Sequence, residues 1–134
     1  MFYNSLLDRF YNILTWFLGG FDDLLFSLIT FVIVECISSI LTFFSLYRFS
    51  LKVAIHWCSR KCVLFLLIGT ANIIDSFLIK NGESIRVFTI WFYISYECII
   101  ILENAVKLGL PVPAKLMDVV HKILKYSRKK HSDN

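Results

Sequence analysis

The sequence predicts an all-α integral membrane protein with three transmembrane helices, an N-terminal amphipathic helix and a basic C-terminal amphipathic helix. Its 134 residues are 57% hydrophobic and only 18% charged, and the mean hydropathy is +0.69. Soluble domains are closer to half apolar and a quarter charged. Three apolar runs also approach the roughly 20 residues that a helix needs to cross the hydrocarbon core. Composition and run length therefore both indicate a membrane protein.

Residues 1–20 are predicted to form an amphipathic helix and not a cleavable signal, since they have neither a basic first region nor a small-residue cleavage site. Gly19 and Gly20 would end this helix, and Asp22 suits the start of the next one. The helix either lies on the membrane surface or packs on the bundle, and the sequence leaves both open. Its apolar face carries Phe2, Leu6, Phe10, Ile13, Leu14 and Phe17.

Three apolar runs define the predicted spans, at residues 24–47, 63–79 and 86–106. The first is long enough to cross the hydrocarbon core, and the second is near the lower limit of about 17 residues. The apolar run of the third, 87–102, becomes a full span when its edges reach Arg86 and Val106. Lys and Arg are unevenly distributed around them: seven in the tail, 107–134, four in the link, 48–62, two around the second link and one before the first span. Because these residues accumulate on the cytoplasmic side, the counts predict an external N-terminus and a cytoplasmic C-terminus.

The stretch Gly109-Leu-Pro-Val-Pro113 is predicted to end the third span, because glycine suits a helix C-terminus and proline cannot continue a helix. Beyond it, an apolar stripe at Leu116, Val119, Val120, Ile123 and Leu124 predicts a second surface helix. A basic amphipathic helix beside a membrane normally lies on anionic headgroups. The side chains predicted to meet anionic lipids are Lys115, Lys122, Lys125, Arg128, Lys129 and Lys130.

Polar side chains within the spans form the candidate functional site. Glu35, Asn72 and Glu97 are placed near the middle of their spans, at one common depth. A carboxylate on lipid costs at least about 2.5–3.5 kcal/mol, so these faces are expected to turn inward or toward water. No Lys or Arg is predicted at this depth, so burial favours carboxyl groups that are protonated and donate hydrogen bonds between helices. The set predicted to form an oligomerisation or lumen face is Glu35, Ser39, Thr42, Asn72, Asp75, Glu97 and Asn104.

Two interpretations of this set stay open: hydrogen bonding within a bundle, or a water-lined surface after protomers assemble. Catalysis is not predicted, because the histidines lie at interfaces or in the tail without nucleophile–base spacing. His56, Cys58 and Cys62 provide too few ligands for a zinc site. No cofactor is expected, and no basic soluble surface with interleaved aromatic residues indicates nucleic-acid binding.

The sequence from Phe92 to Leu116, FYISYECIIILENAVKLGLPVPAKL, resembles the C-terminal signature of the toxin-secretion and phage-lysis holin family, phage holin family 4. In that family an aromatic-rich helix carries a Glu, followed by Leu-Glu-Asn and a Leu-Gly-hydrophobic-Pro-hydrophobic-Pro turn. The rest of the chain matches more loosely, and a glycine that the family has in its first span is absent. The matching residues are Glu97, Leu102, Glu103, Asn104, Gly109, Pro111 and Pro113.

The resemblance implies a holin: a protein that accumulates in the bacterial cytoplasmic membrane and oligomerises into large lesions. A phage endolysin or a large protein toxin then leaves the cell. The expected partners are further copies of the chain, the exported endolysin or toxin as cargo, and anionic lipids at the tail. Two other classes remain open, namely a regulatory or antiholin-like subunit and a small proton-coupled exporter.

Overall fold

The computed structural model describes residues 1–46, 50–79 and 84–133, and every regular element in these ranges is helical. This confirms the predicted all-α fold. The elements are α1 (Phe2–Leu18), α2 (Asp23–Ser45), α3 (Leu51–Ile73), the π-helical η1 (Ile74–Ile79), α4 (Ser84–Lys107) and α5 (Ala114–Ser132).

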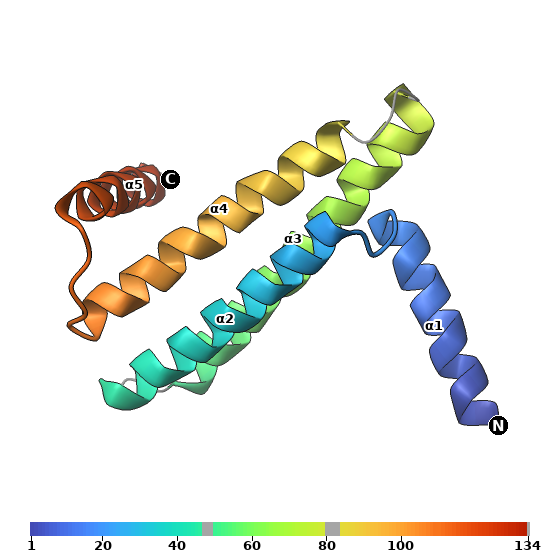
Figure 1. Cartoon of the computed structure of the whole chain (residues 1–134), viewed down its shortest axis with the longest axis horizontal. Coiled ribbons are helices and arrows are strands. Elements are labelled where there is room, and N and C mark those ends of the chain that lie inside the picture. The colour runs from blue at the N-terminus through green and yellow to red at the C-terminus, as the bar shows by residue number, and fades with distance from the viewer. Residues whose placement is uncertain (47–49, 80–83, 134) are drawn as a thin grey trace.

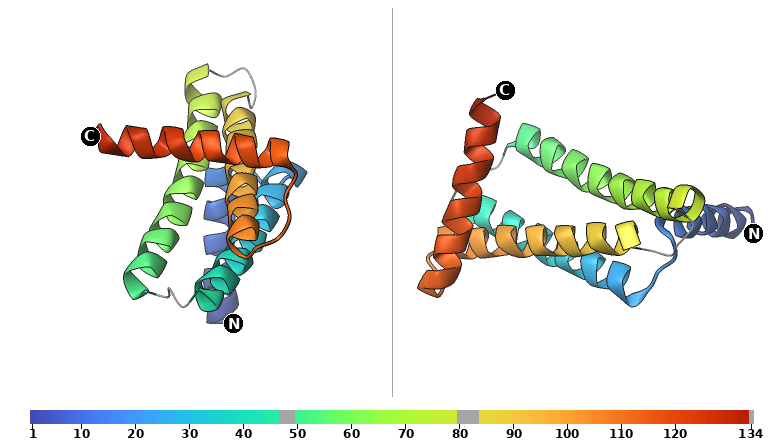
Figure 2. Two further views of the ribbon diagram at one scale, coloured as in Figure 1. Left: turned by 90° about the vertical axis from the view of Figure 1, so that its left-hand side faces the viewer. Right: turned by 90° about the horizontal axis from the view of Figure 1, so that it is seen from above.

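Helices α2, α3 and α4 run alongside one another and form the body of the molecule (Figure 1). Helix α4 packs most extensively on α2 and less on α3, and α1 packs on α3. Helix α1 projects away from this bundle at the end where α2 begins. This end of the bundle is called the α1 end. Helix α5 crosses the opposite end, where α4 finishes, and this is called the α5 end (Figure 2).

Three helical segments are long and apolar enough to cross a membrane: α2, α3 with η1, and α4. The central segment, Leu51–Ile79, differs from the prediction because most of the expected link at 48–62 is helical and continuous with the span. Its 29 residues are about 43 Å long at 1.5 Å per residue. Tyr47 and residues 48–49, at the end of the first predicted span and the start of the link, lie outside the described residues.

Helices end or begin at the breaks predicted around Gly19, Asp22 and Gly109. Gly19 ends α1 with a φ of 83°, and Gly109 follows α4 with a φ of 82°, conformations that glycine adopts without steric cost. The side chain of Asp22 accepts a hydrogen bond from the backbone N–H of Leu25 at 3.0 Å and caps α2. Pro111 and Pro113 then separate α4 from α5.

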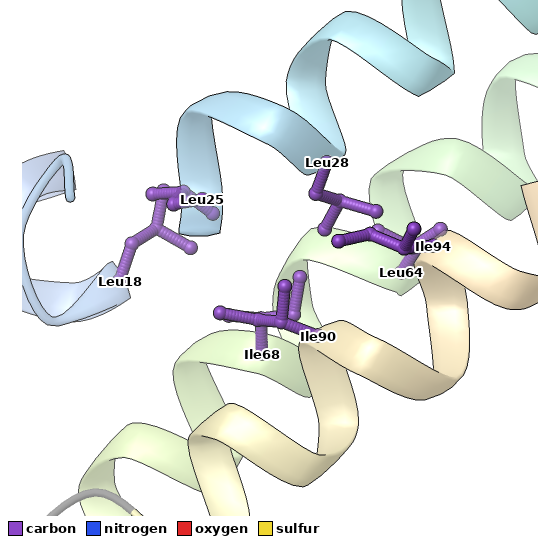
Figure 3. Packing of buried hydrophobic residues seen from close by; sticks show 7 residues of the cluster. All are labelled: Leu18, Leu25, Leu28, Leu64, Ile68, Ile90 and Ile94. Carbon is purple, nitrogen blue, oxygen red and sulfur yellow. The ribbon is translucent and has the colours of Figure 1, made fainter. Parts of the chain in front are cut away.

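The apolar core occupies the half of the bundle nearer the α1 end. It is formed by side chains from α1, α2, α3 and α4: Leu18, Leu25, Leu28, Leu64, Ile68, Ile90 and Ile94 (Figure 3). Among the described residues, eight polar or charged residues and eight apolar residues are buried. Many large apolar side chains point outward instead, such as Ile33, Leu66 and Phe88. An apolar outside around a partly polar inside suits a helix bundle in lipid.

Candidate functional site

The buried face of α4 combines polar and apolar side chains. Arg86, Ile90, Ile94, Glu97 and Asn104 lie on one helical face and are all buried. Arg86 is at the α1 end, the two isoleucines are in the apolar core, and Glu97 and Asn104 follow toward the α5 end. The polar residues therefore belong to two separate clusters with apolar packing between them.

The first cluster, called the shared-lysine cluster, consists of Glu35, Ser39, Trp57, Lys61 and Glu97. The Nζ of Lys61 lies 2.9 Å from Oε2 of Glu35 and 2.5 Å from Oε1 of Glu97, so one cation from α3 pairs with carboxylates from α2 and α4. Glu35 also accepts hydrogen bonds from Ser39 Oγ at 2.5 Å and from Trp57 Nε1 at 3.0 Å. Both glutamates are buried, and the Lys61 side chain is 12% exposed.

An amide and hydroxyl layer continues this cluster toward the α5 end. The Nδ2 of Asn104 donates to Ser38 Oγ at 2.9 Å and to Ser39 Oγ at 3.0 Å, which ties α4 to α2. The hydroxyl of Thr42 donates to the backbone carbonyl of Ser38 at 2.8 Å. Ser39 thus receives a hydrogen bond from α4 while it donates one to Glu35. The cluster is connected through side chains from all three spanning helices.

Two predictions about the depth of these residues are wrong. Lys61 is a basic partner of Glu35 and Glu97 at a depth where none was expected. Asn72 is also not at their depth. It lies eleven residues (72 − 61) beyond Lys61 on α3, which corresponds to about 16 Å along the helix. Both errors arise because the helix begins at Leu51, so Lys61 lies inside the bundle and Asn72 lies near its far end.

The second cluster, called the arginine clamp, consists of Asp22, Asn72, Asp75 and Arg86 at the α1 end. Arg86 is fully buried, and its guanidinium donates from Nη1 to Asp22 Oδ2 at 2.8 Å. It also donates to two backbone carbonyls, those of Leu18 at 2.7 Å and Gly20 at 3.0 Å. Arg86 thereby satisfies carbonyl groups that the end of α1 leaves without helical partners.

Asn72 and Asp75 complete the clamp. The Nδ2 of Asn72 donates to the backbone carbonyl of Phe17 at 3.1 Å. The carboxylate of Asp75 accepts from the backbone N–H groups of Ile85 at 3.1 Å and Arg86 at 2.8 Å, next to the start of α4. A Cβ at Gly19 would overlap the side chains of Asn72 and Arg86, so the clamp closes directly against the glycine turn.

The two clusters differ in charge balance and in the nature of their partners. In the shared-lysine cluster one ammonium group faces two carboxylates. In the clamp Arg86 pairs with Asp22, and the side-chain hydrogen bond from Arg86 lowers the pKa of Asp22 from its ordinary value of 3.8. Most other clamp partners are backbone groups at helix ends. The clamp thus resembles capping, whereas the shared-lysine cluster depends on side chains that can change partners.

All seven residues of the predicted polar set are buried in the chain. Their role in an assembly stays a prediction. Four residues that define the two clusters lie outside the predicted set, namely Asp22, Trp57, Lys61 and Arg86. A helical spacing could have revealed two of them, since Trp57, Lys61, Leu64 and Ile68 continue one face of α3 across the predicted boundary at residue 63. The members of the predicted set are Glu35, Ser39, Thr42, Asn72, Asp75, Glu97 and Asn104.

The signature residues serve different purposes. Glu97 and Asn104 belong to the buried polar network, while Glu103 pairs with Lys107 at 3.1 Å on a partly exposed face of α4. On α5 the described basic side chains are exposed, and that of Arg128 lies outside the described part of the chain. Their contact with lipid stays a prediction. The exposed basic residues are Lys115, Lys122, Lys125, Lys129 and Lys130.

The fold and its interior define a small multi-pass membrane protein whose three spanning helices enclose paired charges. Residues 12–125 match the model of the bacteriophage holin family, and the chain belongs to this family. It is 34% identical to the uncharacterized protein YtkC of Bacillus subtilis over 115 residues, 85% of each chain. It is 38% identical to a probable holin of Bacillus phage phi105 over 64 residues, 48% of this chain and 47% of the other. No solved structure matches.

Proposed function

We propose that this protein is a holin that oligomerises in the bacterial cytoplasmic membrane and forms lesions through which an endolysin or a large protein toxin leaves the cell. Family membership and three helices of spanning length support the proposal. The observation that carries it furthest is Lys61 between Glu35 and Glu97. A bundle of three helices needs no buried ions to pack in lipid, and charges at such positions usually serve function.

In this proposal the shared-lysine cluster is a polar surface that one chain keeps closed. The apolar core lies nearer the α1 end, so the part of α3 nearer the α5 end is tied to α2 and α4 by the polar contacts of Trp57 and Lys61. Movement of this part of α3 would uncover Glu35 and Ser39 on α2, and Glu97 and Asn104 on α4. Neighbouring copies or water can then take the place of Lys61, which converts an internal network into an assembly or lumen face.

The proposed orientation has the N-terminus outside and the C-terminus in the cytoplasm, with the basic residues of α5 on anionic headgroups. Helix α5 lies across the ends of the spanning helices, which supports the position of its basic residues on the headgroups (Figure 2). A single cysteine at Ser132, in a chain whose native cysteines are replaced by serine, should react with a membrane-impermeant maleimide only after the cells are opened. Labelling in intact cells would overturn the orientation.

Expression of the chain alone in a bacterium tests the function. We expect an abrupt loss of membrane potential after a delay, followed by release of a folded cytoplasmic reporter protein. Loss of potential without protein release would favour an exporter or a small channel. Stable potential with inserted protein, checked by immunoblot, would instead favour a regulatory or antiholin-like subunit.

A further inference from the structure

A long groove lies between α3 and α4. Near the α5 end it widens to a cavity of about 480 Å³, which is lined from His56 to Leu67 on α3 and from Phe92 to Ile100 on α4. A second hollow of about 400 Å³ follows, and both are lined by Leu67, Phe92 and Tyr93. The two hollows adjoin at these shared residues, and together they are called the α3–α4 groove.

The chemistry of the groove changes along its length. Its mouth, nearer the α5 end, is lined by the polar side chains of His56, Ser59 and Arg60. Mostly apolar side chains follow, from Val63 and Leu67 on α3 to Ile74 of η1, with Phe88 and Phe92 on α4. Thr70 and Thr89 lie among them. A cationic mouth followed by apolar walls matches an amphipathic molecule with a negative head.

Arg60 is a second cation, beside Lys61, at the mouth of the groove. Its guanidinium lies over the ring of Tyr96, 5.5 Å from the ring centroid, and no carboxylate in the described part of the chain forms an ion pair with it. The neighbouring Lys61 already pairs with Glu35 and Glu97. Glu97 also lines the cavity, but it is fully buried and Lys61 contacts both of its oxygens.

The position of Arg60 along the helix suits a lipid headgroup. The segment Leu51–Ile79 is about 43 Å long, close to the roughly 40–45 Å of a bilayer with its headgroups. Arg60 is nine residues (60 − 51) from Leu51, about 13 Å along the axis. Helical side chains point toward the helix N-terminus, so the guanidinium can extend to the headgroup boundary while its stem stays in the apolar layer.

We propose that the α3–α4 groove binds an anionic phospholipid, with the headgroup phosphate at Arg60 and an acyl chain along the apolar walls. Basic pockets between transmembrane helices bind anionic headgroups in this way. From Arg60 to Ile74 the groove runs fourteen residues (74 − 60), about 21 Å, which is longer than the roughly 15 Å of one hydrocarbon leaflet. An apolar helix of a second copy would fit the walls but would bring no anionic group to Arg60.

The groove contains its own reporter, because Trp57 lines the cavity. The full chain with Trp16→Phe and Trp91→Phe retains Trp57 as its single tryptophan. It is reconstituted in phosphatidylcholine vesicles with rising fractions of lipid brominated on the acyl chain, either phosphatidylglycerol or phosphatidylcholine. We expect half-maximal quenching at a mole fraction about fivefold lower for phosphatidylglycerol, since one basic residue near the surface gives an attraction of this size.

Matched variants test whether Arg60 causes the preference for phosphatidylglycerol. Arg60→Gln should give equal quenching by the two lipids, and Arg60→Lys should keep the preference because it keeps the charge. Lys52→Gln removes the same charge from α3 outside the residues that line the groove, and should also keep the preference. The unquenched emission maximum and circular dichroism check that each variant is folded.

Three results would overturn the site: equal quenching of the parent protein by both lipids, equal loss of preference in Arg60→Gln and Lys52→Gln, or quenching that falls as the protein-to-lipid ratio rises. The last would mean that a second copy covers the groove. Because the measurement has no lesion readout, its failure would leave the proposed holin function untouched, and a chain that forms no lesions can still show the lipid preference.

Discussion

The arginine clamp and the shared-lysine cluster both bury charges between helices, but they are built from different partners. Arg86 donates to an N-cap carboxylate and to carbonyls of Leu18 and Gly20, groups that any helix end presents. Among the described residues the ammonium group of Lys61 pairs with side chains, and it serves two carboxylates at once. The clamp therefore fixes where three helices begin or end, whereas the shared-lysine cluster can exchange its partners without undoing a helix. This difference separates a folding element from a candidate assembly face.

The largest expected effect is on the clamp. Arg86→Met removes every hydrogen-bond donor of the guanidinium, so the Asp22 carboxylate and two backbone carbonyls lose their partner. We therefore expect the free energy of unfolding to fall by about 3–5 kcal/mol. Thermal unfolding in mild detergent and the amount of inserted protein measure this. Arg9→Met, on an exposed face of α1, is the control. Wild-type stability of Arg86→Met would show that the clamp is dispensable.

The next prediction separates charge from packing in the shared-lysine cluster. Lys61→Met leaves two buried carboxylates without a cation and should destabilise the closed chain by about 3 kcal/mol. Glu97→Gln leaves Lys61 paired with Glu35, so we expect normal amounts of inserted protein. We expect depolarisation earlier than wild type for Lys61→Met after matched induction, and close to wild type for Glu97→Gln. Identical timing in Lys61→Met and Lys52→Met would remove the cluster from the mechanism.

Two adjacent glycines test the clamp more finely. Gly19 and Gly20 have φ values of 83° and 97°, so alanine at either position carries a left-handed strain of about 1–2 kcal/mol. Only at Gly19 would the new Cβ overlap Asn72 and Arg86, whereas nothing lies within 4 Å at Gly20. Gly19→Ala should therefore cost about 1–3 kcal/mol more than Gly20→Ala in detergent unfolding. Equal losses would contradict the close contact.

The smallest effect concerns pH. Because Arg86 lowers the pKa of Asp22, the ionised carboxylate stabilises the fold above its ordinary pKa of 3.8, and this contribution is lost as pH falls through the lower folded value. The Asp22 side chain is 43% exposed, so solvent screening keeps the effect small. The stability difference between wild type and Asp22→Asn should shrink below about pH 3.8. Asp23→Asn is the control, and a constant difference would contradict the assignment.

Local sequence was sufficient for the helical fold and most helix ends. Gly19, Gly109 and the prolines act through their own backbone preferences, and the apolar runs act through length and composition, so neither needs knowledge of distant contacts. The inward orientation of Glu35 and Glu97 was also predictable, because a carboxylate on lipid is costly wherever the helix packs. The start of α3 could not be predicted in this way. The charges at Arg60 and Lys61 indicated a link, although they lie within a helix.

The amino-acid sequence thus specifies the spanning helices, their breaks and the inward polar faces, since each follows from local preference or from the cost of transfer to lipid. Packing between the helices is what joins Lys61 to Glu35 and Glu97, brings Arg86 to the end of α1 and places Asn72 in the clamp. These pairings join residues 26 (61 − 35) to 68 positions apart in the chain. They depend on how far each helix slides along its neighbours, and helical periodicity specifies a face but not that axial position.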